Sequence, residues 1–265
     1  MHCSANLMKK QPYVAITGLV SAGEVDFASK QFHNLYSAVS SHNPAVGFLV
    51  SEKTLKDKTA DNLRFPDLKT VQSLLARTPA GIYRVIHYKT TNNKTVARQV
   101  AELFGGNCSA DLCDIIQLNM PSEQTNEIAI IKASFNFEIA LKIPNYDLSA
   151  KEIAGKVMEY GNIVDYVLLE LPKSNQGGFK IDARIDLYKE LKSMPAGWIL
   201  GFVGGFTGWN VEERLNEIAK KVGDKNFCVD AVSGLRDRIS DNAGDDLFDR
   251  KRVNNYLKAV AQVLK

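Results

Sequence analysis

The stretches GFVGGFTGWNVEE (residues 201–213) and FCVDAVSGLRD (residues 227–237) decide the fold. Each begins as a short apolar strand and ends in a glycine-containing turn, at Gly204 and Gly205 in the first and at Gly234 in the second. Because glycine has no Cβ atom, backbone N–H groups in such turns can approach an anion closely, and a helix that opens after the turn adds the positive end of its dipole. The two turns are therefore predicted to bind a phosphate.

The same alternation of strand and helix runs through the rest of the chain. Short apolar runs occupy residues 13–20, 45–51, 82–89, 114–120, 137–143, 166–171, 198–205 and 227–234. Amphipathic stretches between them include residues 26–40, 67–76, 91–104, 149–160, 211–222 and 250–264. Continuous apolar strands are typical of a parallel sheet buried on both faces, and eight strand-helix units close into a cylinder. The sequence predicts an α/β protein with one (β/α)8 TIM-barrel domain over residues 13–265, after a lead-in at residues 1–12.

Composition is that of an ordinary globular protein with a large core, since 45% of the 265 residues are hydrophobic and 24% are charged. The net charge of +3 comes from interspersed acidic and basic residues, which gives no indication of nucleic-acid binding. No apolar run is long enough for a membrane span, and the first residues lack the apolar core of a signal peptide, so we expect a cytoplasmic protein. The four cysteines and four histidines are dispersed and predict neither a metal site nor disulfides.

Three long loops, at residues 52–66, 172–182 and 236–249, follow the second, sixth and eighth predicted strands. All three leave carboxyl ends of strands, where barrel enzymes place their active sites. We therefore expect them to form lids or ligand walls, although solvated loops without a function remain an alternative.

Seven segments, in order and at matching places in the strand-helix alternation, resemble the phosphoribosylanthranilate isomerase family. They are VAITGL (14–19), AVGFLV (45–50), YRVIHY (83–88), IIQLN (115–119), VLLE (167–170) with the GGFKID loop, VGGFTGWNV (203–211) and VDAVSGL (229–235). The resemblance implies an Amadori rearrangement of a phosphorylated ribosylamine in tryptophan biosynthesis, without a cofactor.

In that family a carboxylic acid on strand 6 protonates the sugar ring oxygen, and a cysteine on strand 1 removes the proton from C2. By this resemblance Glu170 is the acid, whereas Thr17 stands in place of the cysteine and Asn119 in place of a histidine. A hydroxyl is a much weaker base than a thiol near neutral pH, so the base has been replaced. Asp230, which matches an aspartate of the family, is the best titratable substitute.

Strand alternation directs Gln117 and Asn119 to the barrel mouth with Thr17, Glu170 and Asp230. The resemblance adds a substrate-binding role for Arg64 in the loop after strand 2. It also assigns phosphate contacts, to Gly177, Gly178, Gly204, Gly205, Ser233 and Gly234.

The directions of His87, Lys89 and Lys142 are not fixed by the sequence, and for His87 a packed or solvent-facing role is favoured over catalysis. Three functions remain open: this isomerisation, another reaction on a phosphorylated metabolite that uses Glu170, Asp230 and Lys142, or ligand binding without catalysis. In each case the expected partner is a phosphorylated small molecule, with no nucleic acid, membrane, metal or cofactor. A monomer and a homodimer are both compatible with the sequence.

Overall fold

The structure is a computed structural model, and it describes residues 10–36, 41–57, 62–119, 124–172, 181–241, 244 and 246–265. Most of the predicted lead-in at residues 1–12 therefore lies outside the described residues, and residues 10–12 lead directly into the first strand.

Eight parallel strands form a closed barrel in which each strand pairs with the next and the last pairs with the first. The strands are β1 (Tyr13–Thr17), β2 (Asn43–Ser51), β3 (Tyr83–Lys89), β4 (Ile115–Asn119), β5 (Glu138–Ile143), β6 (Tyr166–Glu170), β7 (Ile199–Val203) and β8 (Cys228–Ala231). This confirms the predicted (β/α)8 barrel.

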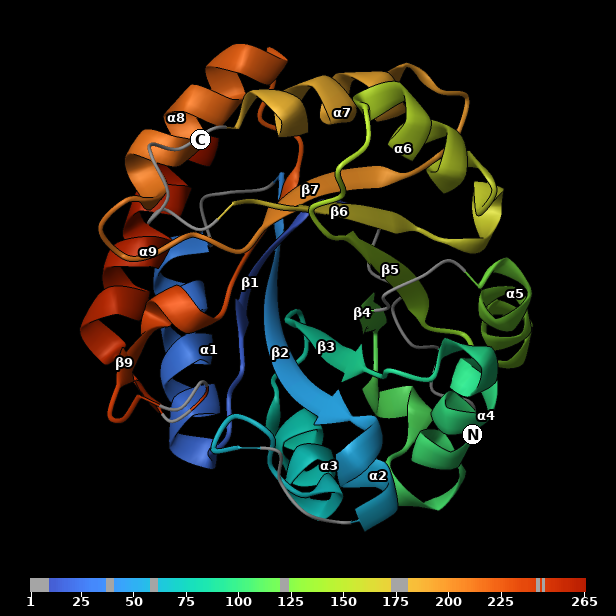
Figure 1. The fold of residues 1–265 in the computed structure, drawn as a ribbon. Coiled ribbons are helices and arrows are strands. Elements are labelled where there is room, and N and C mark those ends of the chain that lie inside the picture. Colours follow the sequence, from blue (N-terminus) through green and yellow to red (C-terminus); the bar gives the residue numbers. More distant parts are fainter. Residues whose placement is uncertain are drawn as a thin grey trace.

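Helices surround the barrel on its outer side (Figure 1). They are α1 (Ala22–Tyr36), α2 (Glu52–Asp57), α3 (Leu68–Arg77), α4 (Val96–Glu102), α5 (Thr125–Ser134), α6 (Ala150–Met158), α7 (Asp182–Ser193), α8 (Val211–Val222) and α9 (Arg250–Leu264). Among the residues described, no helix is long and apolar enough to cross a bilayer.

Alternation along the strands divides the apolar residues into two buried groups. One group fills the barrel and includes Tyr13, Tyr83 and Tyr166, the first residues of their strands. The other, with Val14 and Phe48 among its members, lies between the strands and the helices. Apart from Asn43 on β2 and Glu138 on β5, the inner residues near the amino ends are apolar, whereas polar side chains are frequent on the inner face toward the carboxyl ends.

Several predicted element bounds were wrong. The runs at 13–20 and 198–205 were too long, because the backbone leaves the strand at glycines with positive φ, 87° at Gly18 and 75° at Gly204. The helix predicted at 26–40 begins earlier, at Ala22, because the Ser21 hydroxyl accepts from the Glu24 N–H in the first turn and the Glu24 carboxylate accepts from the Val20 N–H just before the helix.

Two of the three predicted loops contain regular structure. Helix α2 starts directly after β2 because the Ser51 hydroxyl accepts a hydrogen bond from the Thr54 N–H at 3.1 Å and Leu55 packs into the core. The segment after β8 contains an antiparallel pair, β9 (Arg236–Arg238) and β10 (Asp246–Phe248). Of the loop at 172–182, residues 173–180 lie outside the described part of the chain.

Candidate active site

Polar side chains from six strands point into the carboxyl end of the barrel. By position and alternation they share the inner face: Thr17 on β1, His87 on β3, Gln117 and Asn119 on β4, Lys142 on β5, Glu170 on β6, and Asp230 on β8. Such a set is costly inside a barrel unless its members have partners or a ligand. This end is therefore where chemistry is to be sought.

The centre of the site is a buried group formed by Thr17, His87 and Asp230, each no more than 3% exposed. The Thr17 Oγ1 atom lies 3.1 Å from His87 Nε2, and His87 Nε2 lies 3.6 Å from Asp230 Oδ2. A hydrogen bond from Thr17 also stabilises the ionised Asp230 carboxyl. Thr17 thus bridges the imidazole and the carboxylate. These contacts give the Thr17 hydroxyl a bridging role and not that of a catalytic base.

Gly47 on β2 makes room for this bridge. A Cβ atom at Gly47 would lie 2.2 Å from Thr17 Oγ1, far inside contact distance. Because Gly47 pairs directly with Thr17 in the parallel ladder, the small residue on β2 and the hydroxyl on β1 are a matched pair. Larger side chains at residue 47 would displace the Thr17 hydroxyl.

Burial sets the charges of this group. Burial, with a smaller effect from the positive charge of Lys142, lowers the pKa of His87 to about 3, so the imidazole is neutral at neutral pH. The Asp230 carboxyl has its pKa raised to about 6 by burial, against the opposing effects of Thr17 and Lys142. The contact between His87 and Asp230 is therefore not an ion pair, and Asp230 is the titrating group.

Asp230 also has an unsatisfied oxygen. Its Oδ1 atom is buried and has no hydrogen-bond partner among the described residues, and the same holds for Oε1 of Gln117. The amide of Gln117 donates to Asn119 Oδ1 at 2.9 Å, which fixes the direction of both side chains. Two buried acceptors without partners can receive hydrogen bonds from the hydroxyl groups of a ligand.

Lys142 and Glu170 form the other charged pair of the site. Lys142 Nζ lies 3.2 Å from Glu170 Oε1, and the two side chains are 25% and 33% exposed. Since Lys142 affects the pKa of both His87 and Asp230, the pair is within electrostatic reach of the buried group. Acidic groups from β6 and β8 therefore share one barrel mouth with a lysine from β5.

The last two strand-to-helix turns lie against each other. A Cβ atom at Gly234 would fall 2.0 Å from the Phe206 carbonyl oxygen, so only glycine allows the two backbones to approach this closely. In the first turn Gly204 and Gly205 both have positive φ, and Asn210 Nδ2 donates to the Gly205 carbonyl at 3.0 Å. These turns are adjacent, as the predicted phosphate site requires, and Gly177 and Gly178 lie outside the described residues.

Arg64 lies in a basic pocket of about 510 Å³ at the barrel mouth. Its guanidinium is bound to Asp246 of β10, with Nε 2.8 and 3.0 Å from the two carboxylate oxygens. Asp246 also accepts a 2.6 Å hydrogen bond from buried Arg236. The pocket is lined by Leu49, Asn62, Arg64, Phe65, Lys89, Ser233, Arg236, Arg238, Gly244 and Asp246. One basic pocket is thus lined both by Arg64, the predicted substrate-binding residue, and by Ser233, a predicted phosphate-binding residue. The Arg64 guanidinium, however, is already hydrogen-bonded to Asp246.

The sequence did not fix the directions of His87 and Lys142: a packed or solvent-facing role was favoured for His87, and Lys142 was a catalytic candidate only for the alternative reaction. The signal was available, because on β3 the period of two places His87 with Val85 on the inner face, and on β5 it places Lys142 with Ala140. Among the described residues no group of three or more His, Cys, Asp or Glu is arranged to hold a metal ion.

Comparison with known proteins gives fold-level similarity. No family model matches the sequence, and no curated protein matches it. Among solved structures, phosphoribosylanthranilate isomerase from Thermus thermophilus is similar with a TM-score of 0.59 and 16% identity, over 94% of this chain and 98% of that one. The enzyme from Thermotoga maritima gives a TM-score of 0.60 at 15% identity, with the same coverage. A Rubisco-like protein from Rhodopseudomonas palustris gives a TM-score of 0.56 at 9% identity, over 96% of this chain and 65% of that one. The chain therefore has a barrel fold similar to that of phosphoribosylanthranilate isomerases, at low sequence identity.

Proposed function

We propose that the protein is an isomerase that converts a phosphorylated aldose or aldosylamine to the corresponding ketose derivative by acid–base catalysis in the barrel mouth. The observation that carries the proposal is the pair of carboxyl groups in this mouth: Asp230, which is buried with one unpartnered oxygen, and Glu170, which is held by Lys142. Reactions of this class need an acid and a base on different sides of one sugar.

Asp230 acts as the base. Its pKa of about 6 leaves it mostly ionised at pH 7 and basic enough to accept a proton from carbon, as an efficient general base requires. The neutral imidazole of His87 and the hydroxyl of Thr17 hold the carboxylate in position. This assignment supplies the base that the sequence resemblance lacked at Thr17.

Glu170 and Lys142 form the acid side. The pair delivers one proton to the ring oxygen as the bond between that oxygen and C1 opens: the Lys142 ammonium passes a proton to the Glu170 carboxylate, which passes it to the ring oxygen. Asp230 then removes the C2 proton, and the electron pair of that C–H bond moves toward C1. Asp230 returns its proton at C1, and the hydroxyl proton of C2 goes back to the Lys142–Glu170 pair, which gives the ketose.

The phosphate of the substrate binds at the adjoining turns. Support comes from the close packing of Gly234 on Phe206, from the positive φ of Gly204 and Gly205, and from α8, which begins at Val211 just beyond the first turn. The basic pocket with Ser233 on its wall continues this surface and favours an anionic ligand.

The test is proton exchange at C2, which does not depend on knowing the exact sugar. Purified protein in D2O is incubated with ribose 5-phosphate and with glucose 6-phosphate, and incorporation of deuterium is followed by NMR. Freshly generated phosphoribosylanthranilate is assayed in parallel by loss of anthranilate fluorescence. We expect exchange or turnover with at least one substrate, lost in Asp230→Asn. Thermal stabilisation by the same compounds without exchange or turnover would overturn the isomerase and indicate a binding protein.

One observation favours a second candidate, an aldolase-type reaction through an imine. The Lys142 amine is partly buried, faces the barrel mouth and lies beside a carboxylate. A lysine in such surroundings can attack a carbonyl carbon with loss of water. Borohydride added with a ketose phosphate would then leave a covalent adduct on Lys142, detectable by mass spectrometry, whereas acid–base isomerisation leaves the mass unchanged.

A further inference from the structure

A pocket of about 540 Å³ lies at the amino end of the barrel, the end opposite the candidate active site. Helix α1 forms one wall, and the start of β2 with the segment before β3 forms the other. Its lining residues are Ser29, Lys30, Phe32, His33, Pro44, Pro79, Ala80, Gly81 and Ile82. Small-molecule sites occupy about 300 to about 1,000 Å³, so the pocket has the size of a ligand site.

Ser29 brings an unpartnered hydroxyl to this pocket. In α3 and α5 the hydroxyls of Ser73 and Ser134 donate to the backbone carbonyl four residues earlier, at 3.0 and 2.7 Å. Ser29 in α1 is 9% exposed, yet its buried hydroxyl has no hydrogen-bond partner among the described residues. Rotation about the Cα–Cβ bond can turn this hydroxyl toward the cavity that Ser29 lines. An oxygen atom of a ligand would then satisfy it.

Positive side chains on the α1 wall have no acidic counterpart in the pocket. Lys30 and His33 are exposed, lie one turn apart on α1, and have no hydrogen-bond or ion-pair partner within the described ranges. Asp26, one turn before Lys30, is held by Arg77 through hydrogen bonds of 2.7 and 2.5 Å. The described residues that line the pocket include no Asp or Glu. The pocket therefore favours an anionic ligand.

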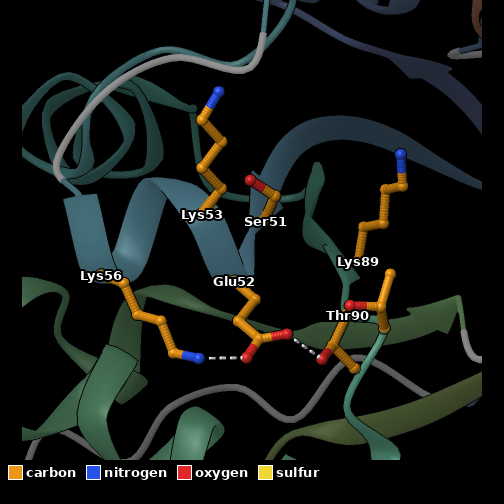
Figure 2. Close-up of a pocket in the computed structure, with 7 residues that line it drawn as sticks. Ser51, Glu52, Lys53, Lys56, Lys89 and Thr90 are labelled. Atoms are coloured by element: carbon orange, nitrogen blue, oxygen red, sulfur yellow. Dashed lines mark hydrogen bonds and ion pairs between the residues drawn. The ribbon is translucent and has the colours of Figure 1, made fainter.

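The pocket at the other end of β2 and β3 differs in this respect. Figure 2 shows its lining, which includes Lys56 of α2 and Lys89, the last residue of β3, but also Glu52. The Glu52 carboxylate accepts hydrogen bonds from Lys56 at 2.5 Å and from Thr90 at 2.8 Å. The protein thus neutralises one of its own lysines there. No described residue does the same for Lys30 at the amino end.

The remaining wall of the amino-end pocket is apolar. Pro44, Pro79 and Ile82 line it, and Phe32 is almost fully buried beneath it, with 1% of its surface exposed. Because proline rings fix the backbone φ angle, this surface is largely preformed. Flat apolar rings pack well on such a surface, and they bury a large area at a small cost in conformational entropy.

We propose that this pocket binds a small aromatic carboxylate. The ring lies against Pro44, Pro79 and Ile82. The carboxylate accepts charge-assisted hydrogen bonds from the Lys30 ammonium and the Ser29 hydroxyl. This site is independent of the proposed function, because none of its residues belongs to the candidate active site at the other end of the barrel.

The experiment compares benzoate with benzamide, which has the same ring and nearly the same shape but no charge. Binding of each compound to the full chain is measured by titration with ligand-observed NMR. We expect benzoate to bind saturably and benzamide to bind about tenfold more weakly, the effect of one charge-assisted contact.

Lys30→Gln locates the carboxylate. It should weaken benzoate binding about tenfold and leave benzamide binding within about twofold. Lys220→Gln is the matched control, because it removes the same charge from an exposed lysine of α8 that does not line the pocket. The affinity of this control for benzoate should equal that of the wild type.

Ser29→Ala tests the hydroxyl. It should weaken benzoate binding about fivefold, the effect of one hydrogen bond. The melting temperature should stay the same or rise, because no protein hydrogen bond is lost and alanine favours the helix. A lower melting temperature would show that the hydroxyl has a structural partner and would overturn its assignment to the ligand.

Three results would overturn the site as a whole. They are no saturable binding of benzoate up to about 10 mM, equal affinities for benzoate and benzamide, and equal effects of Lys30→Gln and Lys220→Gln. Benzoate binding that is weakened by Lys142→Gln and not by Lys30→Gln would place the ligand at the barrel mouth and would also overturn it. None of these results bears on the isomerase, and failure of the isomerase assays would leave this inference standing.

Discussion

The two ends of the barrel each bury an aspartate in a group of charged residues, and they differ in how far the protein's own donors satisfy that aspartate. At the amino end Asp165 accepts hydrogen bonds from Lys132 at 2.7 Å, from Lys10 at 3.1 Å and from the Ile139 N–H at 2.8 Å. At the carboxyl end one oxygen of Asp230 has no hydrogen-bond partner among the described residues. The Asp165 carboxyl thus has several donors from the folded chain, whereas one oxygen of Asp230 has none, and we propose that a ligand supplies its partner.

The pKa values of the two aspartates express this difference. Hydrogen bonds from its neighbours hold the Asp165 carboxyl at a pKa of about 2 despite burial, and the proton of that pair resides on Glu138 instead. Burial dominates at Asp230 and raises its pKa to about 6. A carboxylate whose charge is poorly compensated is costly to stability and useful for catalysis. The comparison therefore supports a structural role for Asp165 and is in keeping with the catalytic role that we propose for Asp230.

The largest expected effect is on turnover. Asp230→Asn keeps the shape of the side chain but removes the base, so the C2 exchange rate should fall about a thousandfold. Stability should be unchanged or higher at neutral pH, because a poorly compensated charge is lost. Exchange kinetics and urea unfolding are measured on the same preparation. An unchanged exchange rate would place the base elsewhere.

Next in size is the effect of Asp165→Asn on stability. Removing this charge leaves Lys132 without its closest partner, so the free energy of unfolding should drop by about 3 kcal/mol. Exchange activity per folded molecule should be retained. The control is Asp26→Asn, which breaks an exposed ion pair with Arg77 and should change little. Equal losses in both variants would show that the amino-end group contributes no more than a surface pair.

The pH dependence of stability should run in opposite directions for the two aspartates. Asp230 binds a proton more tightly folded than unfolded, so its contribution falls by about 3 kcal/mol as pH rises from about 4 to about 6. Asp165 binds its proton less tightly when folded, so its contribution is lost as pH falls from about 4 toward about 2.

Urea unfolding of wild type and of Asp230→Asn across this range isolates the first effect, because Glu138 titrates identically in both proteins. The difference in unfolding free energy between them should change steeply between pH 4 and 6 and be flat above pH 7. A flat difference throughout would mean that Asp230 is not a buried titrating group.

The smallest predicted effect concerns Thr17→Val. The hydrogen bond from Thr17 lowers the Asp230 pKa, so its loss should move the acidic limb of the pH–rate profile to higher pH, by less than about one unit. Thr17→Ser retains the hydroxyl, so the acidic limb of its pH–rate profile should lie at the same pH as that of the wild type. A limb that moves to lower pH would contradict the bridging role of Thr17.

Much of the fold could be predicted from the sequence because its signals are local. Apolar runs alternating with amphipathic stretches indicated the barrel, and Gly204 and Gly205 marked the end of β7. Element bounds were less accurate, since the helix after Ser51 depends on one hydroxyl and one packed leucine. The antiparallel pair after β8 depends on Asp246, whose partners Arg64 and Arg236 are remote from each other in sequence.

The candidate site was predicted only in part. Strand alternation correctly directed Glu170 and Asp230 to one mouth, because side-chain direction has a period of two along a strand. Strand alternation did not predict which side chains these residues meet. Lys142, which contacts Glu170, lies 28 positions before it, and His87, which contacts Thr17, lies 70 positions after it. No local pattern relates residues so far apart.

The sequence by itself determined the strand-helix repeat, the inner face of each strand and the glycines at the turns, because these follow from local backbone preference and from the period of side chains. Only the tertiary structure decided which inward side chains meet. It brings Thr17 close to both His87 and Asp230, and Gly47 leaves the space that the Thr17 hydroxyl needs. It also pairs Arg64 with Asp246 and places Lys89 on the walls of two pockets. Barrel closure makes remote strands neighbours, and the burial that follows sets the charge each side chain carries.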